Sequence, residues 1–153
     1  RADQISLYTG NDDNIVVDLL TEYQIPFESK IWSKRIVGGL LGHWAVWNHS
    51  AVQLLEKIHS GELNHAVQQA MVLANKVTDS NAAFFDSANN FAGCITGLHE
   101  VLRRQGLLEG LWTLDENEVL SPGQSEEIDR VYAAYPELND DDFVAENIDR
   151  WLS

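Results

Sequence analysis

One histidine stands where a side chain could do acid–base chemistry. His43 directly follows a short apolar run that has the character of a buried strand, and Trp44 and Trp47 lie beside it in the sequence. An imidazole in such a place could hydrogen-bond a substrate or act as a general acid or base. The alternative is a packed histidine bonded to a backbone carbonyl, and the sequence leaves both open.

Other residue types that do chemistry are sparse. The remaining four histidines form no i, i+4 pair and no acid-flanked spacing, so we expect no metal site. Cys94 is the only cysteine, which excludes an internal disulfide and a thiolate zinc cluster within one chain. We expect no cofactor.

A polar cluster follows the first candidate strand. Residues 5–9 alternate apolar and polar side chains, and the pattern then breaks at residues 10–14, where glycine, asparagine and aspartate gather. This composition supplies a turn and a helix N-cap together, so we expect strand, loop and helix. Asp12 and Asp13 would then serve the start of the helix, where the helix dipole favours acids.

The elements around these residues form a predicted parallel unit. A short apolar helix over residues 15–20 is followed by turn residues around Pro26 and a basic connector up to Arg35. Residues 36–42 are apolar and rich in glycine, which suits a strand buried on both faces with something packed close to its backbone. Strand, helix and strand in this order indicate two parallel strands.

Beyond Asn48 every apolar pattern has the helical period. The apolar positions that mark the expected helices lie at residues 52–58, 67–85 with a break near 78–80, 91–102, 128–132 and 143–152. Gly106 ends the third of these helices, because a left-handed cap costs glycine little. Ser121, Pro122 and Gln124 form a capping-box pattern before the fourth.

Two parallel strands cannot form a covered sheet by themselves, because each edge needs a neighbour and each face needs helices. We therefore predict an α/β fold that is mostly helical within this chain, with further strands supplied by another part of the protein or by another chain. The chain begins at Arg1 and has the pattern of a buried strand four residues later, which favours a start inside a longer protein.

Several short motifs, taken in order, resemble the dihydrodipicolinate synthase and N-acetylneuraminate lyase family. Residues 8–13 resemble the family's end of strand seven, and residues 39–44 resemble the glycine-rich turn after strand eight. Residues 89–106 and 107–110 resemble its extension helix and the link that follows. The resemblance covers roughly residues 3–135. It implies the last two units of a (β/α)8 TIM barrel over residues 1–60, and a helical extension with an acidic tail over residues 61–153.

The family's chemistry needs a desolvated lysine amine that forms an imine with a 2-oxo acid, because the imine acts as an electron sink when a neighbouring carbon–carbon bond forms or breaks. The resemblance therefore implies part of a lyase or aldolase. It places the Schiff-base lysine on strand six and a proton-shuttling tyrosine on strand five, both outside this chain. None of the chain's four lysines ends a candidate strand, so we expect the chain alone to be inactive.

Loops at the carboxyl ends of barrel strands build such sites. The resemblance places six residues at the substrate: Gly10, Asn11, Asp12, Asp13, His43 and Trp44. Gly10 would let substrate approach the backbone, and the polar side chains after it would accept hydrogen bonds from substrate hydroxyls. His43 would be catalytic and Trp44 would bind substrate, although the family has small hydroxyl residues at these two positions.

The charge balance limits the classes of molecule that the chain could bind. The chain carries 24 acidic and 10 basic side chains for a net charge of −14, so its field repels nucleic acid and anionic membranes. No apolar run approaches the ~20 residues of a membrane span, and no signal peptide is evident, which favours a cytoplasmic location. The expected partners are the amino-terminal part of the same barrel, a small 2-oxo acid and further copies of the chain.

Two other functions stay open. The chain could be an acidic helical interaction module without chemistry, but such a module has no reason to carry the glycine-bracketed segments at residues 8–13 and 38–44. It could also belong to a catalytically inactive barrel, for which the deciding residues lie outside the chain.

Overall fold

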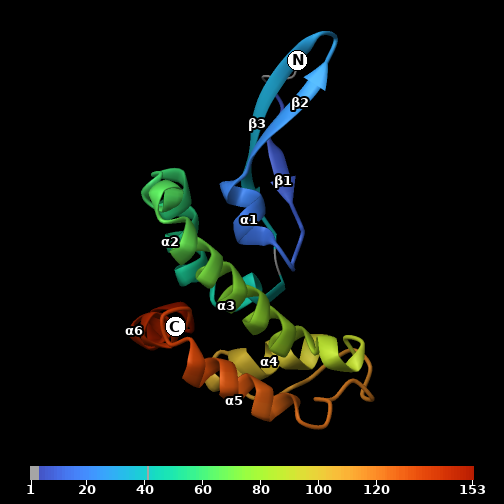
Figure 1. Cartoon of the computed structure of the whole chain (residues 1–153). Helices are drawn as coiled ribbons and strands as arrows, with labels where there is room; N and C mark the ends of the chain where they lie inside the picture. Colours follow the sequence, from blue (N-terminus) through green and yellow to red (C-terminus); the bar gives the residue numbers. More distant parts are fainter. Residues whose placement is uncertain (1–3, 41) are drawn as a thin grey trace. The chain divides into compact units, whose positions relative to one another are not determined.

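A computed structural model of the chain describes residues 4–40 and 42–153 (Figure 1). Leu41, in the glycine-rich run, and the first three residues lie outside this part. The chain divides into two compact units. Of the described residues, 4–40 and 53–78 form the strand unit, and 42–52 and 79–153 form the helical unit. The helices α2 (Asn48–His59) and α3 (Val67–Phe85) each contribute to both.

The strand unit is built on the predicted parallel pair. β1 (Leu7–Thr9) runs parallel to β3 (Lys30–Gly39), and Tyr8 pairs with Gly38 after an irregularity in the register. β2 (Glu22–Phe27) pairs antiparallel with β3, so the sheet has the order β1-β3-β2. The α/β class and the parallel pairing are confirmed.

Close packing explains the glycines of β3. The helix α1 (Ile15–Leu20) buries Ile15, Val16 and Leu19. A Cβ added at Gly39 would lie 2.6 Å from Cδ1 of Ile15, and one at Gly38 would lie 2.9 Å from the ring of Tyr8. Glycine is therefore needed because α1 and the Tyr8 ring approach the strand, and the close packing predicted for this run is confirmed. The predicted burial on both faces is wrong, because Val37 is 46% and Leu40 71% exposed.

The predicted connector over residues 21–35 is wrong. It is a hairpin of β2 and the first half of β3, which begins at Lys30 and not at residue 36. Glu28 and Ser29 form the turn with φ of 46° and 63°, the left-handed pair that a two-residue hairpin requires. The hydroxyl of Tyr23 donates to Asp18 of α1 at 3.0 Å, which holds the base of the hairpin against the helix.

The helical unit confirms that the chain is helical beyond Asn48. It contains α4 (Cys94–Arg104), α5 (Gln124–Ala134) and α6 (Asp141–Trp151) besides the ends of α2 and α3. α3 has no break near residue 78. α4 starts at Cys94 and not at Phe91, because Phe91 has a left-handed φ of 64°. No helix of the described part is long and apolar enough to cross a membrane.

Aromatic side chains form the centre of this unit. Trp47 and Phe84 are almost fully buried, and their rings meet edge to face with centroids 4.8 Å apart. The ring of Tyr132 packs edge-on against Trp47 with centroids 5.2 Å apart. Ile128 and Val131 of α5 are fully buried as well. The core therefore joins the residue just before α2, the end of α3 and α5.

The joint between α3, α4 and α5 depends on two buried polar side chains. The amide nitrogen of Gln124 donates to the backbone oxygen of Gly93 at 2.9 Å, and its oxygen accepts from the backbone nitrogen of Ser121 at 3.0 Å. This second bond is one half of the predicted capping box. The other half is absent, because the backbone nitrogen of Gln124 donates to the backbone oxygen of Ser121 at 3.0 Å and the N-cap of α5 is Gly123. The hydroxyl of Ser121 instead donates to Asp86 at 2.5 Å.

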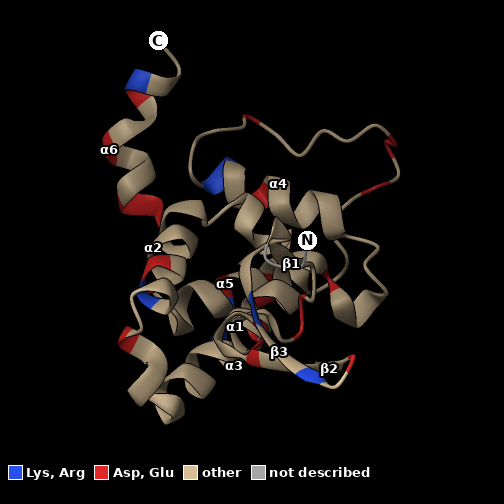
Figure 2. Ribbon diagram, turned by 90° about the horizontal axis from the view of Figure 1, so that it is seen from above, with Lys and Arg blue, Asp and Glu red and all other residues tan. Residues whose placement is uncertain are grey.

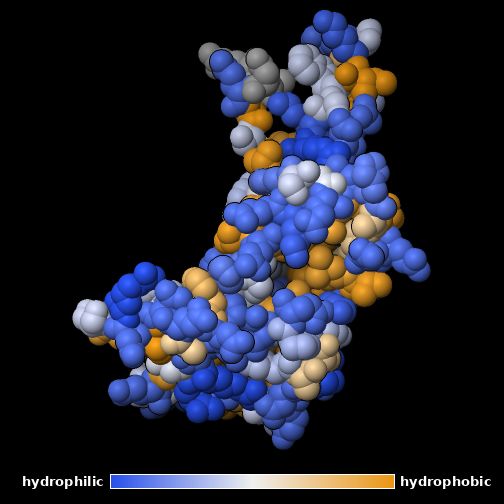
Figure 3. Space-filling view, turned by 90° about the vertical axis from the view of Figure 1, so that its left-hand side faces the viewer, coloured by the Kyte–Doolittle hydropathy of each residue, from blue (hydrophilic) through white to orange (hydrophobic). Residues whose placement is uncertain are grey.

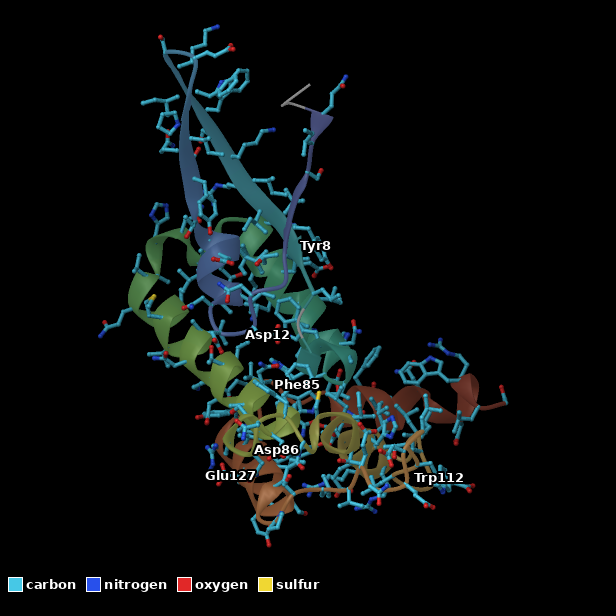
Figure 4. All side chains as sticks on the ribbon, turned by 90° about the vertical axis from the view of Figure 1, so that its right-hand side faces the viewer. Tyr8, Asp12, Phe85, Asp86, Trp112 and Glu127 are labelled. Carbon is cyan, nitrogen blue, oxygen red and sulfur yellow. The ribbon has the colours of Figure 1, made fainter. Side chains whose placement is uncertain are left out.

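Asp86 is the acceptor at the centre of this joint (Figure 4). It has a left-handed φ of 58°, and its carboxylate accepts hydrogen bonds from Ser121, from Asn89 at 2.6 Å and from the backbone nitrogen of Gly93 at 2.9 Å. Burial alone would raise the pKa of Asp86, but the three hydrogen bonds outweigh it and lower the pKa below its ordinary value. The joint therefore favours the ionised carboxylate.

We expect Asp86→Asn to destabilise the helical unit by about 1.5–3 kcal/mol at pH 7, since the amide cannot accept all three bonds. A carboxylate whose folded pKa is lowered contributes stability above its unfolded pKa and loses it as the pH falls through the folded pKa. The difference between the variant and the natural chain should thus shrink below about pH 4. Urea denaturation at pH 7 and pH 3, followed by circular dichroism, measures it. Glu116→Gln, at an exposed position, is the control, and an equal difference at both pH values would contradict the prediction.

Candidate functional site

The carboxyl ends of β1 and β3 meet at one edge of the strand unit. The backbone nitrogen of Leu40 donates to the oxygen of Thr9 at 2.9 Å, one residue beyond the last strand pair. A Cβ added at Gly10 would meet only the Leu40 oxygen, at 3.8 Å, so the space over Gly10 is open. Figure 4 shows Tyr8 on β1 and Asp12 in the loop that follows it. The predicted loop over residues 10–13 therefore lies beside the end of β3.

Asp18 organises this edge from α1. Its carboxylate accepts hydrogen bonds from the hydroxyl of Thr9 at 2.8 Å, from the side-chain nitrogen of Asn11 at 3.3 Å and from the hydroxyl of Tyr23 at 3.0 Å. The backbone nitrogen of Asn11 in turn donates to the Thr9 hydroxyl at 3.1 Å. These bonds fix the course of the loop. Asp18 was not predicted from the sequence, because its position gives no sign that its side chain points from α1 toward β1.

The two aspartates of the loop differ in their surroundings. Asn14 occupies the N-cap position of α1, and no side chain caps this helix. Asp12 is half-buried; burial, followed by the neighbouring charge of Asp13, raises its pKa. Asp13 is exposed, and its backbone oxygen accepts from the hydroxyl of Thr78 at 2.8 Å. Asp12 is thus the carboxylate of this loop best suited to accept a hydrogen bond from a ligand.

His43 belongs to the helical unit, where it is buried. Its ring lies edge-on to Trp44, Trp47 and Phe84, with centroids 5.9–6.3 Å apart. Burial lowers the pKa of His43 to about 3, although a hydrogen bond with Asn81 opposes the shift, so the imidazole is neutral at pH 7. These surroundings favour the packed alternative over a general acid. The predicted roles of His43 and Trp44 at a substrate stay predictions.

The six predicted site residues fall in both units. The loop over residues 10–13 lies at the β1–β3 edge of the strand unit, whereas in the helical unit the ring of His43 packs against Trp44 and Trp47. Gly42, just before His43, is required by packing: a Cβ there would lie 1.1 Å from the ring of Phe85. The glycine-rich run therefore serves the packing of both units.

A groove in the strand unit was not predicted from the sequence. It has a volume of about 400 Å³, and the residues that line it are Val17, Leu20, Thr21, Arg35, Leu63, Asn64, Val67, Ala70 and Met71. Arg35 is its only charged lining residue, and none of the six predicted site residues lines it. The signal available in the sequence was the spacing of Val67 and Met71 by one helical turn. The structure shows that both side chains are exposed on α3.

Comparisons with known proteins leave the family unassigned. The chain matches no family model, no curated protein and no solved structure. Within residues 4–40 and 42–153, no group of three histidine, cysteine, aspartate or glutamate side chains could hold a metal ion.

Proposed function

We propose that this chain supplies the last two β/α units and the helical extension of a TIM barrel that resembles dihydrodipicolinate synthase. In this proposal it is part of a carbon–carbon lyase or aldolase that acts on a 2-oxo acid. The Schiff-base lysine lies outside this chain, and the loop over residues 10–13 faces the substrate. The amino-terminal part of the barrel is the required partner.

The observation that carries the proposal is the β1–α1–β3 unit. Its strands are parallel and adjacent, and the loops that follow both strands leave from the same edge, which is where α/β barrels build their sites. Within the described residues, no strand covers the outer edge of β1, and β2 pairs with β3 only up to Arg35. The outer edge of β1 is thus free, and so is the edge of β3 beyond Arg35 that faces away from β1. Two neighbouring strands of a closed sheet need such free edges to pair with the strands on either side.

Imine trapping tests the proposal. An affinity tag on the polypeptide that contains this chain, introduced in the source cells, retrieves that polypeptide or the complex in which it works. We expect that incubation with pyruvate and borohydride converts an imine into a stable secondary amine, and that peptide mass spectrometry finds the added mass on a lysine outside this chain. Mass on Lys30, Lys34, Lys57 or Lys76 would contradict the placement of the strands. No trapping with pyruvate or with a panel of other small 2-oxo acids would favour an inactive barrel.

Within that assembly we expect Asp12→Asn to lower turnover by about 10- to 100-fold while imine trapping persists. The proposed carboxylate acts on the substrate beyond the imine carbon, and the loss of one buried charge-assisted hydrogen bond costs roughly 1.5–3 kcal/mol. Steady-state kinetics and the trapped fraction are measured on the same preparations. Glu126→Gln, at an exposed position on α5, is the matched control. Equal losses of turnover and trapping would remove Asp12 from this role.

A further inference from the structure

The hairpin of β2 and β3 has two unlike faces. Cross-strand partners point to the same side of a hairpin, and alternate residues share a face. The register pairs Tyr23 with Lys34, Ile25 with Trp32 and Phe27 with Lys30, so these six side chains form one face, which we call the arm face. Three of its apolar members are well exposed: Ile25 at 43%, Phe27 at 60% and Trp32 at 40%.

The opposite face is polar and largely self-satisfied. Ser33 donates to the carboxylate of Glu22, and the side-chain nitrogen of Gln24 donates to the hydroxyl of Ser33 at 3.3 Å. Ile31 is the exposed large apolar residue on this side, at 70%. In the space-filling view the hairpin, at the top, shows hydrophobic side chains among hydrophilic ones (Figure 3). An amphipathic ribbon of two strands is marginal by itself, so its apolar face needs a cover.

The charge of the arm face indicates what covers it. Lys30 and Lys34 form no ion pair within the described residues, whereas Arg103, Arg104 and Arg130 all pair with carboxylates. Residues 22–35 contain three basic and two acidic side chains in a chain whose net charge is −14. The arm face is therefore a locally basic, aromatic surface on an acidic protein. Its charge is opposite in sign to the net charge of the chain, so a second copy of the chain can offer it a complementary surface.

Helix α6 offers the matching surface. Asp142, Glu146 and Asp149 are exposed and recur at the spacing of one helical face, and the exposed apolar residue Leu152 follows Asp149 by three positions. Figure 2 shows acidic positions recurring along α6 and basic positions on the hairpin. Carboxylates beside an apolar side chain are the counterpart of lysines beside aromatic ones.

Sheet extension through the outer edge of β2 is disfavoured. In a two-residue hairpin the pair that flanks the turn is hydrogen-bonded, and the pairs then alternate. Pro26, one residue further along, therefore has its nitrogen on the open edge, where it offers no donor to another strand. The face, and not the edge, is the surface left for docking.

We propose that the arm face docks on helix α6 of a second copy of this chain, reciprocally, as a two-fold dimer. A specific interface buries roughly 1,000 Å² or more, and a buried aromatic side chain contributes about 150–250 Å². One arm with two exposed aromatic residues is small for this, but a two-fold arrangement uses the arm and the helix twice. The inference is independent of the proposed lyase function.

Sedimentation of the full chain over a range of concentrations tests the dimer. We expect a concentration-dependent dimer that Phe27→Ser/Trp32→Ser weakens about 100-fold. Ile31→Ser, at the more exposed apolar residue of the opposite face, should leave it unchanged. A natural chain that stays monomeric at high concentration would overturn the proposal. So would equal weakening by Ile31→Ser, which indicates unspecific apolar contact, or no effect of the arm variants, which indicates association through other edges.

A charge swap tests the partner surface. Lys30→Glu/Lys34→Glu and Glu146→Lys/Asp149→Lys should each fail to form homodimers, because each places like charges across both contacts. Mixed together they restore opposite charges at both contacts, and we expect a heterodimer at concentrations where each variant alone is monomeric. Circular dichroism confirms that both variants are folded. If the mixture stays monomeric although each variant is folded, α6 is not the partner surface and the proposal fails.

Discussion

Replacing Phe84 with alanine is expected to destabilise the helical unit by about 3–5 kcal/mol. Phe84 is completely buried, and its ring packs edge-on against His43, Trp47 and Tyr132. The loss combines the transfer free energy of the ring with the cost of the cavity, because the neighbouring aromatic side chains cannot collapse fully into the space. Few single changes in this unit should cost more.

The measurement is urea denaturation at pH 7, followed by circular dichroism and by tryptophan fluorescence. Phe91→Ala is the matched control: it removes the same side chain in the same unit, but from a position that is 60% exposed. We expect it to change the free energy of unfolding by less than about 1 kcal/mol, as most surface substitutions do. Similar midpoints for the two variants would mean that Phe84 is not at the centre of the core.

Gly97→Ala is expected to destabilise the same unit by about 3 kcal/mol, although alanine inside a helix is usually better than glycine by about 0.5–1 kcal/mol. Gly97 lies in the first turns of α4, and a Cβ there would lie 2.1 Å from the backbone oxygen of Phe84 and 2.5 Å from the side-chain nitrogen of Gln124. A rotamer change cannot move a backbone oxygen. α4 must therefore shift away from α3, and the Gln124 bonds break.

Gly110→Ala is the control for this change, because the atoms nearest to its added Cβ belong to the exposed side chain of Trp112, which can move aside. Thermal unfolding of both variants gives the comparison. A stabilised Gly97→Ala chain would show that helix propensity outweighs packing at this position, and it would contradict the close contact of α4 with α3.

The parallel unit was predictable because its two strands carry strong local signals. β1 alternates and ends at a turn cluster, and the second half of β3 is apolar and rich in glycine. The hairpin was missed although Tyr23, Ile25 and Phe27 alternate, because Pro26 argues against a strand and the turn lacks the usual asparagine and glycine. The adjacent pair Ile31 and Trp32 then hides the period in the partner strand.

One part of the candidate site was also predictable from local sequence signals, and another part was not. The loop over residues 10–13 was predictable because glycine and acids after a strand are a local signal. Asp18 was not, because its three hydrogen bonds exist only once α1 has packed against both β1 and β2. The burial of His43 depends on Phe84, 41 positions along the chain, whose contact no local pattern predicts.

The turn of Glu28 and Ser29 has a consequence for how the chain tolerates changes in length. Both residues hold a left-handed backbone that costs a residue other than glycine roughly 1 kcal/mol, and both side chains are exposed. Extra residues inserted here would replace a strained pair and would displace no packed side chain. The tip of the hairpin is therefore the point at which insertions between β2 and β3 should accumulate among variants, while the arm face keeps its register.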